Sequence, residues 1–286
     1  MRPFAAVHIS AGDSLLSDEL AQVRTKKKEF LAQIDRIIPW GEWIALIRPC
    51  YYKGERGNKP YDLERMLRIY MIQNLYNLSD MSTVAEVIDS RAFSDFCGVE
   101  SSNQVPDGDT LGRFRNLLIQ NDLQQRLFAQ VVALLTERNL ILKKGTIVDS
   151  TFIEAPSSTK NKDKKRDPEA HSAKKGNTWH FGYKAHVGVN HETCIVHALE
   201  VTSVNKHNVC MTAELLTGEG SRAQVKRRER EKSSVRAKVE HVFAVVKQQL
   251  RFRKTRYRGL RKQTAKLNML FALANLILAD RPCLAA

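Results

Sequence analysis

The alternation of apolar and polar residues in the first half of the chain follows the period of an α-helix. Apolar side chains recur three and four residues apart over long stretches, and no β-branched stretch with strict alternation interrupts them. Pro39 stops the first stretch, and Ser82 is placed to cap a later one. We expect an all-α N-terminal module over residues 1–142, with helices at residues 29–38, 61–76, 82–88, 110–119 and 123–138.

The pattern changes after residue 142. Residues 145–153 form a short β-branched apolar run typical of a buried strand, and the polar, lysine-rich residues 156–177 indicate a loop. A turn at residues 190–192 separates two further extended runs and predicts an antiparallel hairpin. We therefore expect an α/β domain over residues 143–286, with hairpin strands at 179–189 and 193–204 and helices at 207–216, 235–250 and 266–280.

The charge is divided unevenly between these two halves. The 286 residues include 46 Lys and Arg against 31 Asp and Glu, a net charge of +15. Residues 1–142 hold 17 basic and 18 acidic side chains, whereas residues 143–286 hold 29 and 13. Such asymmetry favours a polyanionic partner, most often a nucleic acid, over the alternative of a solubilising basic surface.

The basic residues of the second half gather in runs at residues 160–166, 222–232 and 251–262. In the third run, Phe252 and Tyr257 stand among the cations and can pack or stack. The cations of this run that we expect to neutralise phosphates are Arg251, Arg253, Lys254, Arg256 and Arg258.

Signals for membranes, export and disulfides are weak. The longest mostly apolar run, residues 269–279, is shorter than the ~20 residues that cross a bilayer. Acidic residues at positions 13, 18 and 19 fall where a signal peptide needs an apolar core. The five cysteines are scattered and no pair has CxxC spacing. We expect a cytoplasmic protein with no membrane partner, no disulfide framework and no structural zinc.

Two carboxylates are candidates for chemistry. Asp149 follows an apolar strand run, and a carboxylate at the carboxyl end of a buried strand is well placed to bind a divalent metal. Glu240 borders the apolar arc of the helix expected at residues 235–250, in one stripe with Arg236 and Lys247. Taken singly, a turn residue and an ordinary surface pair of Arg236 and Glu240 remain the simpler interpretations. The histidines lack the spacing of a zinc site.

The segments around these carboxylates resemble those of bacterial insertion-sequence transposases of the DDE type, and the closest branch is insertion-sequence family five. Residues 145–161 (GTIVDSTFIEAPSSTKN) are similar to its first catalytic segment, and residues 166–171 and 174–188 to the next. Arg236, Glu240 and Lys247 match the R-x3-E-x6-K spacing of its signature. Residues 60–61, 66–69 and 76–80 resemble its N-terminal region.

The resemblance implies an RNase H-like catalytic domain in which three carboxylates hold two Mg²⁺ or Mn²⁺ ions. Asp149 would bridge the two metals and Glu240 would ligate one of them. Two cations of this kind activate the attacking oxygen and stabilise the leaving oxygen during phosphoryl transfer. Arg236 and Lys247 would meet phosphates of double-stranded DNA beside the site. The resemblance also implies a homo-oligomer assembled on DNA and a nucleoid-associated location.

One expected carboxylate is missing. The family carries a second Asp on a further strand, but no Asp occurs here between Asp167 and Asp280. Ser233 also stands where the signature has a tyrosine. A replacement would have to meet the near-octahedral geometry of Mg²⁺. The carboxylates considered as replacements, each of them a poor one, are Asp163, Asp167, Glu214 and Glu219.

Three hypotheses follow. The first is a transposase that binds terminal inverted repeats but has an internal deletion impairing DNA cutting and joining. The second is a non-catalytic DNA-binding remnant that occupies transposon ends and regulates transposition. The third is a general basic protein that binds RNA or DNA, with strong salt dependence and no preference for inverted repeats.

Overall fold

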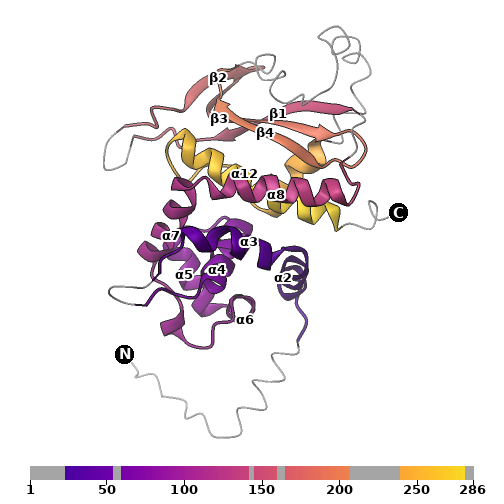
Figure 1. The fold of residues 1–286 in the computed structure, drawn as a ribbon. Helices are drawn as coiled ribbons and strands as arrows, with labels where there is room; N and C mark the ends of the chain where they lie inside the picture. Colours follow the sequence, from indigo (N-terminus) through magenta and orange to yellow (C-terminus); the bar gives the residue numbers. More distant parts are fainter. Residues whose placement is uncertain (1–22, 54–58, 142–144, 160–164, 207–238, 281–286) are drawn as a thin grey trace, which may run out of the picture.

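The computed structural model describes residues 23–53, 59–141, 145–159, 165–206 and 239–280. A group of helices forms one layer, a sheet forms another, and two long helices lie between them (Figure 1). The described elements up to residue 137 are α2 (Lys26–Ile37), α3 (Trp40–Ile47), η1 (Arg48–Cys50), α4 (Leu63–Leu75), α5 (Asp80–Asp89), α6 (Arg91–Cys97), η2 (Ser102–Gln104), α7 (Gly108–Gln120) and α8 (Leu123–Glu137). All of them are helical.

The later described elements are β1 (Thr146–Glu154), β2 (His171–Lys175), β3 (Thr178–Asn190), β4 (Val196–Ser203), the π-helical turn η3 (Val245–Gln249) and α12 (Leu260–Ala279). This combination of helices with an antiparallel sheet confirms the expected α/β class. The helix expected at residues 207–216 lies outside the described residues.

Short polar side chains begin several of the helices. Asp62 accepts a hydrogen bond from the backbone N–H of Arg65 at 2.9 Å and so caps α4. Ser79 accepts one from the N–H of Ser82 at 3.1 Å. Ser79 is therefore the cap of α5, and the prediction that Ser82 caps this helix was wrong. Caps of this kind contribute about 1 kcal/mol each because they satisfy otherwise unpaired N–H groups.

The sheet is built around β3. β1 pairs antiparallel with β3 from Thr146 opposite Asn190 to Glu154 opposite Gly182. β2 and β4 pair, also antiparallel, with successive parts of the opposite edge of β3. The hairpin of β3 and β4 confirms the one expected from the sequence. The loop expected over residues 156–177 is corrected in part, because β2 forms within it by pairing with the start of β3.

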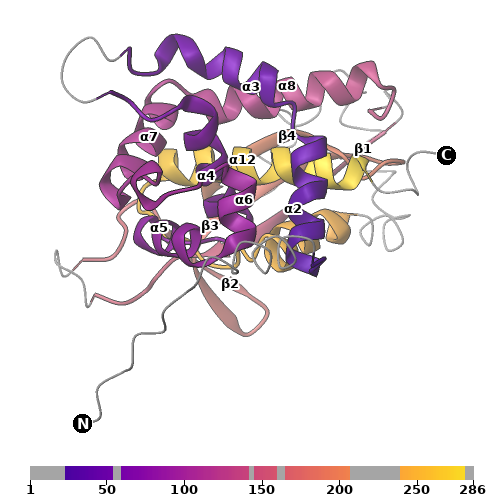
Figure 2. The same cartoon turned by 90° about the horizontal axis from the view of Figure 1, so that it is seen from below.

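Helix α12 lies at the centre of the core. Its residues from Leu267 to Leu278 are all buried, so it is covered on every side. It packs along α8 and against β4, and Figure 2 shows it running across the molecule behind the N-terminal helices. Asn275 joins it to the sheet, since its amide accepts from Val196 N–H at 2.9 Å and donates to Val196 C=O at 2.7 Å. One continuous apolar core therefore joins both layers.

No described helix is long and apolar enough to cross a membrane.

Candidate active site

Asp149 lies on β1 and faces the core side of the sheet. It stands opposite Val187 in the pairing with β3, and Val187 is fully buried. Asp149 is half-exposed, and its Oδ1 accepts a hydrogen bond from the backbone N–H of Ser150 at 2.7 Å. The expectation that Asp149 ends its strand is wrong, because the pairing with β3 continues to Glu154. The carboxylate is therefore held by the middle of a paired strand.

Glu240 lies on a helix that continues into η3. Residues 239–244 are α-helical and Val245–Gln249 form the π-helical turn. Val239, Val242 and Val246 are buried, as the predicted apolar arc requires, and Glu240 is exposed beside them. A π-helical turn widens the helix by one residue, and such turns are frequent at functional sites. Lys247 lies within that turn and is half-buried, whereas Arg236 lies outside the described residues.

The strand that carries Asp149 contacts the segment that follows the helix of Glu240. Lys254 forms a parallel bridge with Glu154, the last residue of β1, and Thr255 N–H donates to Glu154 C=O at 2.7 Å. Asp149 is set back from that junction by roughly 17 Å of strand at ~3.3 Å per residue. Glu240 is set back by roughly 14 Å of helix at ~1.5 Å per residue up to Gln249, and then by the non-helical residues 250–253. The junction therefore joins the end of β1 to the segment that follows the helix, and does not by itself bring Asp149 beside Glu240.

The described residues do not supply a complete metal centre. Among them, no group of three His, Cys, Asp or Glu side chains is placed to hold a metal ion. Asp149 and Glu240 are hard oxygen ligands of the kind that Mg²⁺ prefers, but a centre of three carboxylates needs one more. Two of the considered replacements, Glu214 and Glu219, lie outside the described residues, as does Asp163. The described set therefore does not fit a two-metal centre.

Asp167, the remaining replacement, is occupied elsewhere. It is only 5% exposed, and its Oδ2 accepts from the Tyr183 hydroxyl at 2.6 Å and from Gly259 N–H at 3.0 Å. Tyr183 stands opposite Ile153, four residues along β1 from Asp149 and so roughly 13 Å away. Asp167 and Glu169, which accepts from Leu260 N–H at 2.5 Å, together cap the start of α12. Asp167 is thus a structural anchor of that helix.

The third basic run connects the sheet to the N-terminal helices. Its five predicted phosphate-binding residues are exposed, namely Arg251, Arg253, Lys254, Arg256 and Arg258. Two of them contact the segment after α4: Arg256 Nε donates to Asn77 C=O at 3.0 Å, and Arg251 C=O accepts from Asn77 Nδ2 at 3.0 Å. Arg258 donates to Lys165 C=O at 3.1 Å, and Arg253 to Lys247 C=O at 3.4 Å. The run therefore also has a structural role.

The aromatic residues of this run pack inside the protein. Phe252 is only 1% exposed. Tyr257 lies under the Arg115 guanidinium, 4.2 Å from ring centroid to Cζ, and its hydroxyl accepts from Arg115 Nη1 at 2.9 Å. Burial raises the pKa of Tyr257 to about 12. Of the two possibilities that the sequence left open, packing and stacking, the structure shows packing.

A buried polar junction beneath this run was missed by sequence reasoning. Lys266 of α12 is 7% exposed, and its Nζ donates to Asn74 Oδ1 of α4 at 2.9 Å. Burial, helped by the nearby charges of Arg256 and Arg115, lowers the pKa of Lys266 to about 7. Asp80 contributes the opposite charge, since it pairs with Arg115. The only sequence signal was a lysine followed by a long apolar helix.

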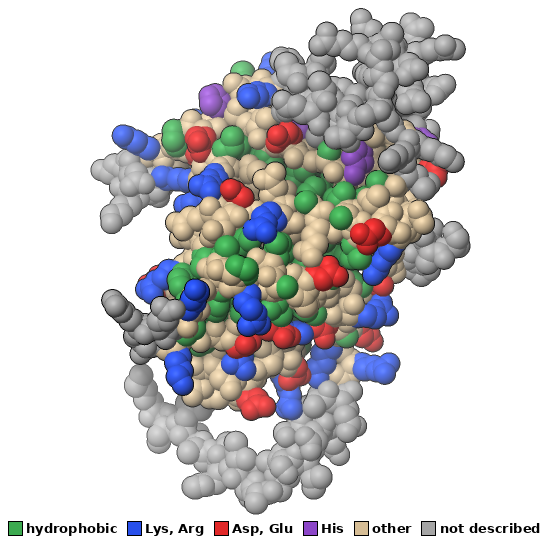
Figure 3. All heavy atoms as spheres, in the orientation of Figure 1, with side chains coloured by type: hydrophobic (Ala, Val, Ile, Leu, Met, Phe, Trp, Pro, Cys, Tyr) green, Lys and Arg blue, Asp and Glu red, His purple; other side chains and the backbone are tan. Residues whose placement is uncertain are grey.

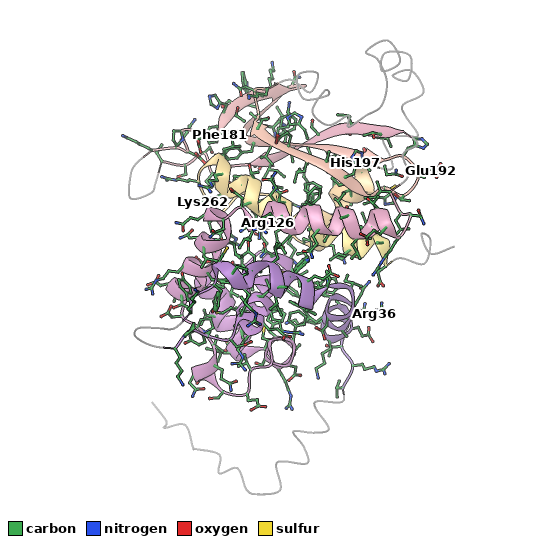
Figure 4. All side chains as sticks on the ribbon, viewed as in Figure 1. Arg36, Arg126, Phe181, Glu192, His197 and Lys262 are labelled. Atoms are coloured by element: carbon green, nitrogen blue, oxygen red, sulfur yellow. The ribbon has the colours of Figure 1, made fainter. Side chains whose placement is uncertain are left out.

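Charges on the helical layer are mixed. On the face seen in Figure 3, acidic and basic side chains are interspersed over the N-terminal helices. Several of them are paired: Arg68 with Asp35 at 2.7 Å and Arg36 with Asp280 at 2.8 Å. Figure 4 places Arg36 on α2, near the end of α12 that carries Asp280. The strongly basic character of the chain is therefore carried by its second half.

Two family models match the chain. Residues 18–117 match the family described as Transposase domain (DUF772). Residues 141–222 and 212–276 match the family described as Transposase DDE domain, in two segments that overlap at residues 212–222. No solved structure matches the chain. The first match covers most of the helical layer, and the second covers the sheet, the helix of Glu240 and most of α12.

Proposed function

The chain is a DDE-type transposase, and on that premise we propose that it binds the terminal inverted repeats of an insertion sequence of family five but lacks part of the catalytic domain. The observation that carries this proposal is the missing second Asp, since no aspartate occurs between Asp167 and Asp280. The DDE family model also matches in two segments that meet at residues 212–222, in the stretch where that aspartate would be expected. A deletion at this point accounts for both features.

An RNase H-like arrangement is the proposed framework of residues 143–286. The antiparallel succession of β1, β3 and β4, with α12 packed against β4, supports it. In this framework Asp149 is the first catalytic carboxylate and Glu240 the last. In an intact relative the bound Mg²⁺ or Mn²⁺ ions supply the activation of the attacking oxygen. Asp149 on a fully paired strand is half-exposed and Glu240 is exposed beside its buried helix face, and this accessibility supports the proposal that both are oxygen ligands.

Duplex DNA is the proposed partner, contacted by both halves of the chain as a homo-oligomer. The helical module, residues 1–142, is proposed to recognise the sequence of the DNA ends. Exposed cations of the second half are proposed to meet phosphates, which fix the protein on the duplex without reading sequence. Lys254 is the best placed of these, because the side chains of Arg253, Arg256 and Arg258 also hold backbone carbonyls and Arg251 C=O accepts from Asn77. Arg236 and Lys247 keep the DNA-contacting roles that the family signature implies.

A binding and cleavage assay tests the proposal. The inverted repeats are read from the DNA that flanks the gene, and labelled repeat DNA is incubated with the protein and Mg²⁺ or Mn²⁺. We expect binding that prefers the repeat over a scrambled duplex, without metal-dependent nicking. Nicking that is lost in Asp149→Ala and Glu240→Ala, but kept in the exposed-turn control Glu192→Gln, would contradict the proposed catalytic defect.

A second candidate function follows from the same missing aspartate. A protein that occupies transposon ends without cutting them competes with an intact transposase and so regulates transposition. In the test, this chain is added to an active relative that cleaves the same transposon ends. The rate of strand cleavage should then fall in proportion to the fraction of ends that this chain occupies. A chain that binds repeat and scrambled DNA equally would instead be a general basic nucleic-acid-binding protein.

A further inference from the structure

The β2–β3 hairpin carries an exposed tryptophan beyond the rest of the sheet. Among the described strands, β3 pairs with β1 and β4 only from Gly182 onward, and its first residues pair with β2 alone. Trp179 lies in that extension and exposes 69% of its surface. Figure 2 shows the hairpin projecting away from the helices, and in Figure 4 Phe181 marks the same end of the sheet, opposite the end of Glu192. An indole this exposed loses the stabilisation that burial would give it.

The surroundings of Trp179 are cationic. Lys174 stands directly opposite Trp179 in the β2–β3 pairing and is exposed, so both side chains project from the same face of the hairpin. Arg166 is also exposed, and its Cζ lies 5.7 Å from the ring centroid of Phe181, which shares that face. The hairpin therefore presents a flat aromatic surface between positive charges.

The acidic side chains described near the hairpin have partners of their own. Glu154 Oε1 lies 3.7 Å from His180 Nδ1 of β3. Asp167 is buried against Tyr183 and Gly259. Glu169 accepts from Leu260 N–H. Asp167 and Glu169 are thus directed to the start of α12, and Glu154 and His180 lie on the face of the sheet opposite to that of Trp179 and Lys174. This charge pattern suits a polyanion better than a neutral protein surface or a second copy of this basic chain.

We propose that the β2–β3 hairpin contacts DNA at an unpaired base, with Trp179 stacked on the base and Lys174 on the adjoining phosphate. The inference rests on the proposed function, because it assumes that the chain binds DNA. An indole stacks on every base, so the contact is insensitive to sequence but requires a base that has left the duplex. It gives the protein a preference for DNA whose end is opened over DNA that is fully paired.

The test compares two DNAs and matched variants of the full-length chain. The DNAs share length and sequence, but one ends in three unpaired nucleotides on each strand and the other is fully paired. Binding is measured by fluorescence anisotropy at constant salt, together with the tryptophan emission of the protein. The variants are Trp179→Ala, Trp179→Phe and Lys174→Gln. The control is Met81→Ala, which removes an apolar side chain that is 71% exposed on the helical layer.

We expect Trp179→Ala to weaken binding to the opened DNA by about 5- to 150-fold, the equivalent of losing one stacked base. Trp179→Phe should keep most of that affinity, and Lys174→Gln should mainly reduce its salt dependence. Binding of the paired duplex and the behaviour of Met81→Ala should stay within about twofold of the unmodified chain. Opened DNA should quench the emission of the unmodified chain more strongly than that of Trp179→Phe.

Distinct results would overturn the inference. Equal affinities of the unmodified chain and Trp179→Ala for opened DNA would exclude the stacking contact while leaving DNA binding intact. Loss of self-association in Trp179→Ala, seen by sedimentation velocity with unchanged DNA affinity, would identify the hairpin as an interface between copies. Failure of the unmodified chain to bind either DNA would reject the proposed function itself.

Discussion

Lys266 Nζ of α12 lies 2.9 Å from Asn74 Oδ1 of α4, in a buried junction between the helical layer and the central helix. The groups that face it are charged as well as polar: Arg115 and Asp80 from the helical layer and Arg256 from the third basic run. Two of these three neighbours are cations, and burial opposes the charged form of Lys266. The pKa of Lys266 is consequently lowered from 10.5 to about 7.

This lowered pKa predicts a specific pH dependence of stability. Between pH 7 and 10.5 the unfolded chain keeps the Lys266 proton while the folded chain releases it, so stability rises with pH in that window. One proton corresponds to at most about 1.4 kcal/mol per pH unit. Lys266→Met removes this dependence and should be more stable than the unmodified chain at pH 6–7.

The measurement is the free energy of urea unfolding at pH 6, 7, 8 and 9 for both proteins. The advantage of Lys266→Met should be constant below pH 7 and shrink above it. Tyr257, with its pKa raised to about 12, does not titrate in this range. An advantage that is independent of pH from 6 to 9 would contradict the assignment.

Asn275 provides a second prediction, about the attachment of α12 to the sheet. Its amide satisfies both the N–H and the C=O of Val196. Asn275→Leu leaves these two buried backbone groups unpaired, at about 1–3 kcal/mol each. The matched control is Asn268→Leu on the same helix, since Asn268 is buried and donates to Thr264 C=O of its own helix, four residues away.

Thermal and urea unfolding of both asparagine variants should therefore differ. We expect Asn275→Leu to lose about 2–5 kcal/mol and Asn268→Leu clearly less, because only the first change breaks contacts between a helix and a strand. Similar losses in the two variants would show that helix propensity and packing, and not the contacts with Val196, set the cost.

Asp167 and Tyr183 form a buried pair whose coupling can be measured. The Tyr183 hydroxyl donates to Asp167 Oδ2 at 2.6 Å, and burial, together with this carboxylate, raises the pKa of Tyr183. In a double-mutant cycle of Asp167→Ala and Tyr183→Phe, we expect a coupling energy of about 1–3 kcal/mol, as for a hydrogen bond to a charged group. A coupling near zero would show that Asp167 anchors α12 through Gly259 alone.

Sequence reasoning recovered the long, periodic helices and the β3–β4 hairpin but missed elements whose signals are short or distant. Pro39 follows the end of α2 as predicted, but it also occupies the N-cap position of α3, a helix that was not predicted. The strand β2 carries little apolar pattern and forms by pairing with β3. Helix α12 begins at Leu260, six residues before the predicted start, because Asp167 and Glu169 cap it from about 90 residues away.

The candidate site likewise combines residues that the sequence predicts with residues that it does not. Asp149 and Glu240 are predicted from ordered segments that resemble a family, because such chemistry depends on residue type and spacing along the chain, and their catalytic role stays a prediction. The polar junction of Lys266, Asn74 and Asp80 was not identified, because it joins residues nearly 200 positions apart. The sequence also does not distinguish aromatic residues that pack inside the protein from exposed ones. Phe252 and Tyr257 pack inside, whereas Trp179 is exposed.

The third basic run yields a final prediction, since its members differ in what they already contact. Arg256 Nε donates to Asn77 C=O, so Arg256→Gln should lower stability by about 1 kcal/mol. Lys254 is exposed and joins the sheet through its backbone bridge with Glu154, so its ammonium is expected to serve phosphates. Lys254→Gln should leave stability within about 0.5 kcal/mol and reduce the slope of log affinity against log salt concentration by about 0.9. Urea unfolding and DNA titrations at several salt concentrations measure both effects. An unchanged salt slope in Lys254→Gln would place the phosphate contacts elsewhere on the basic half.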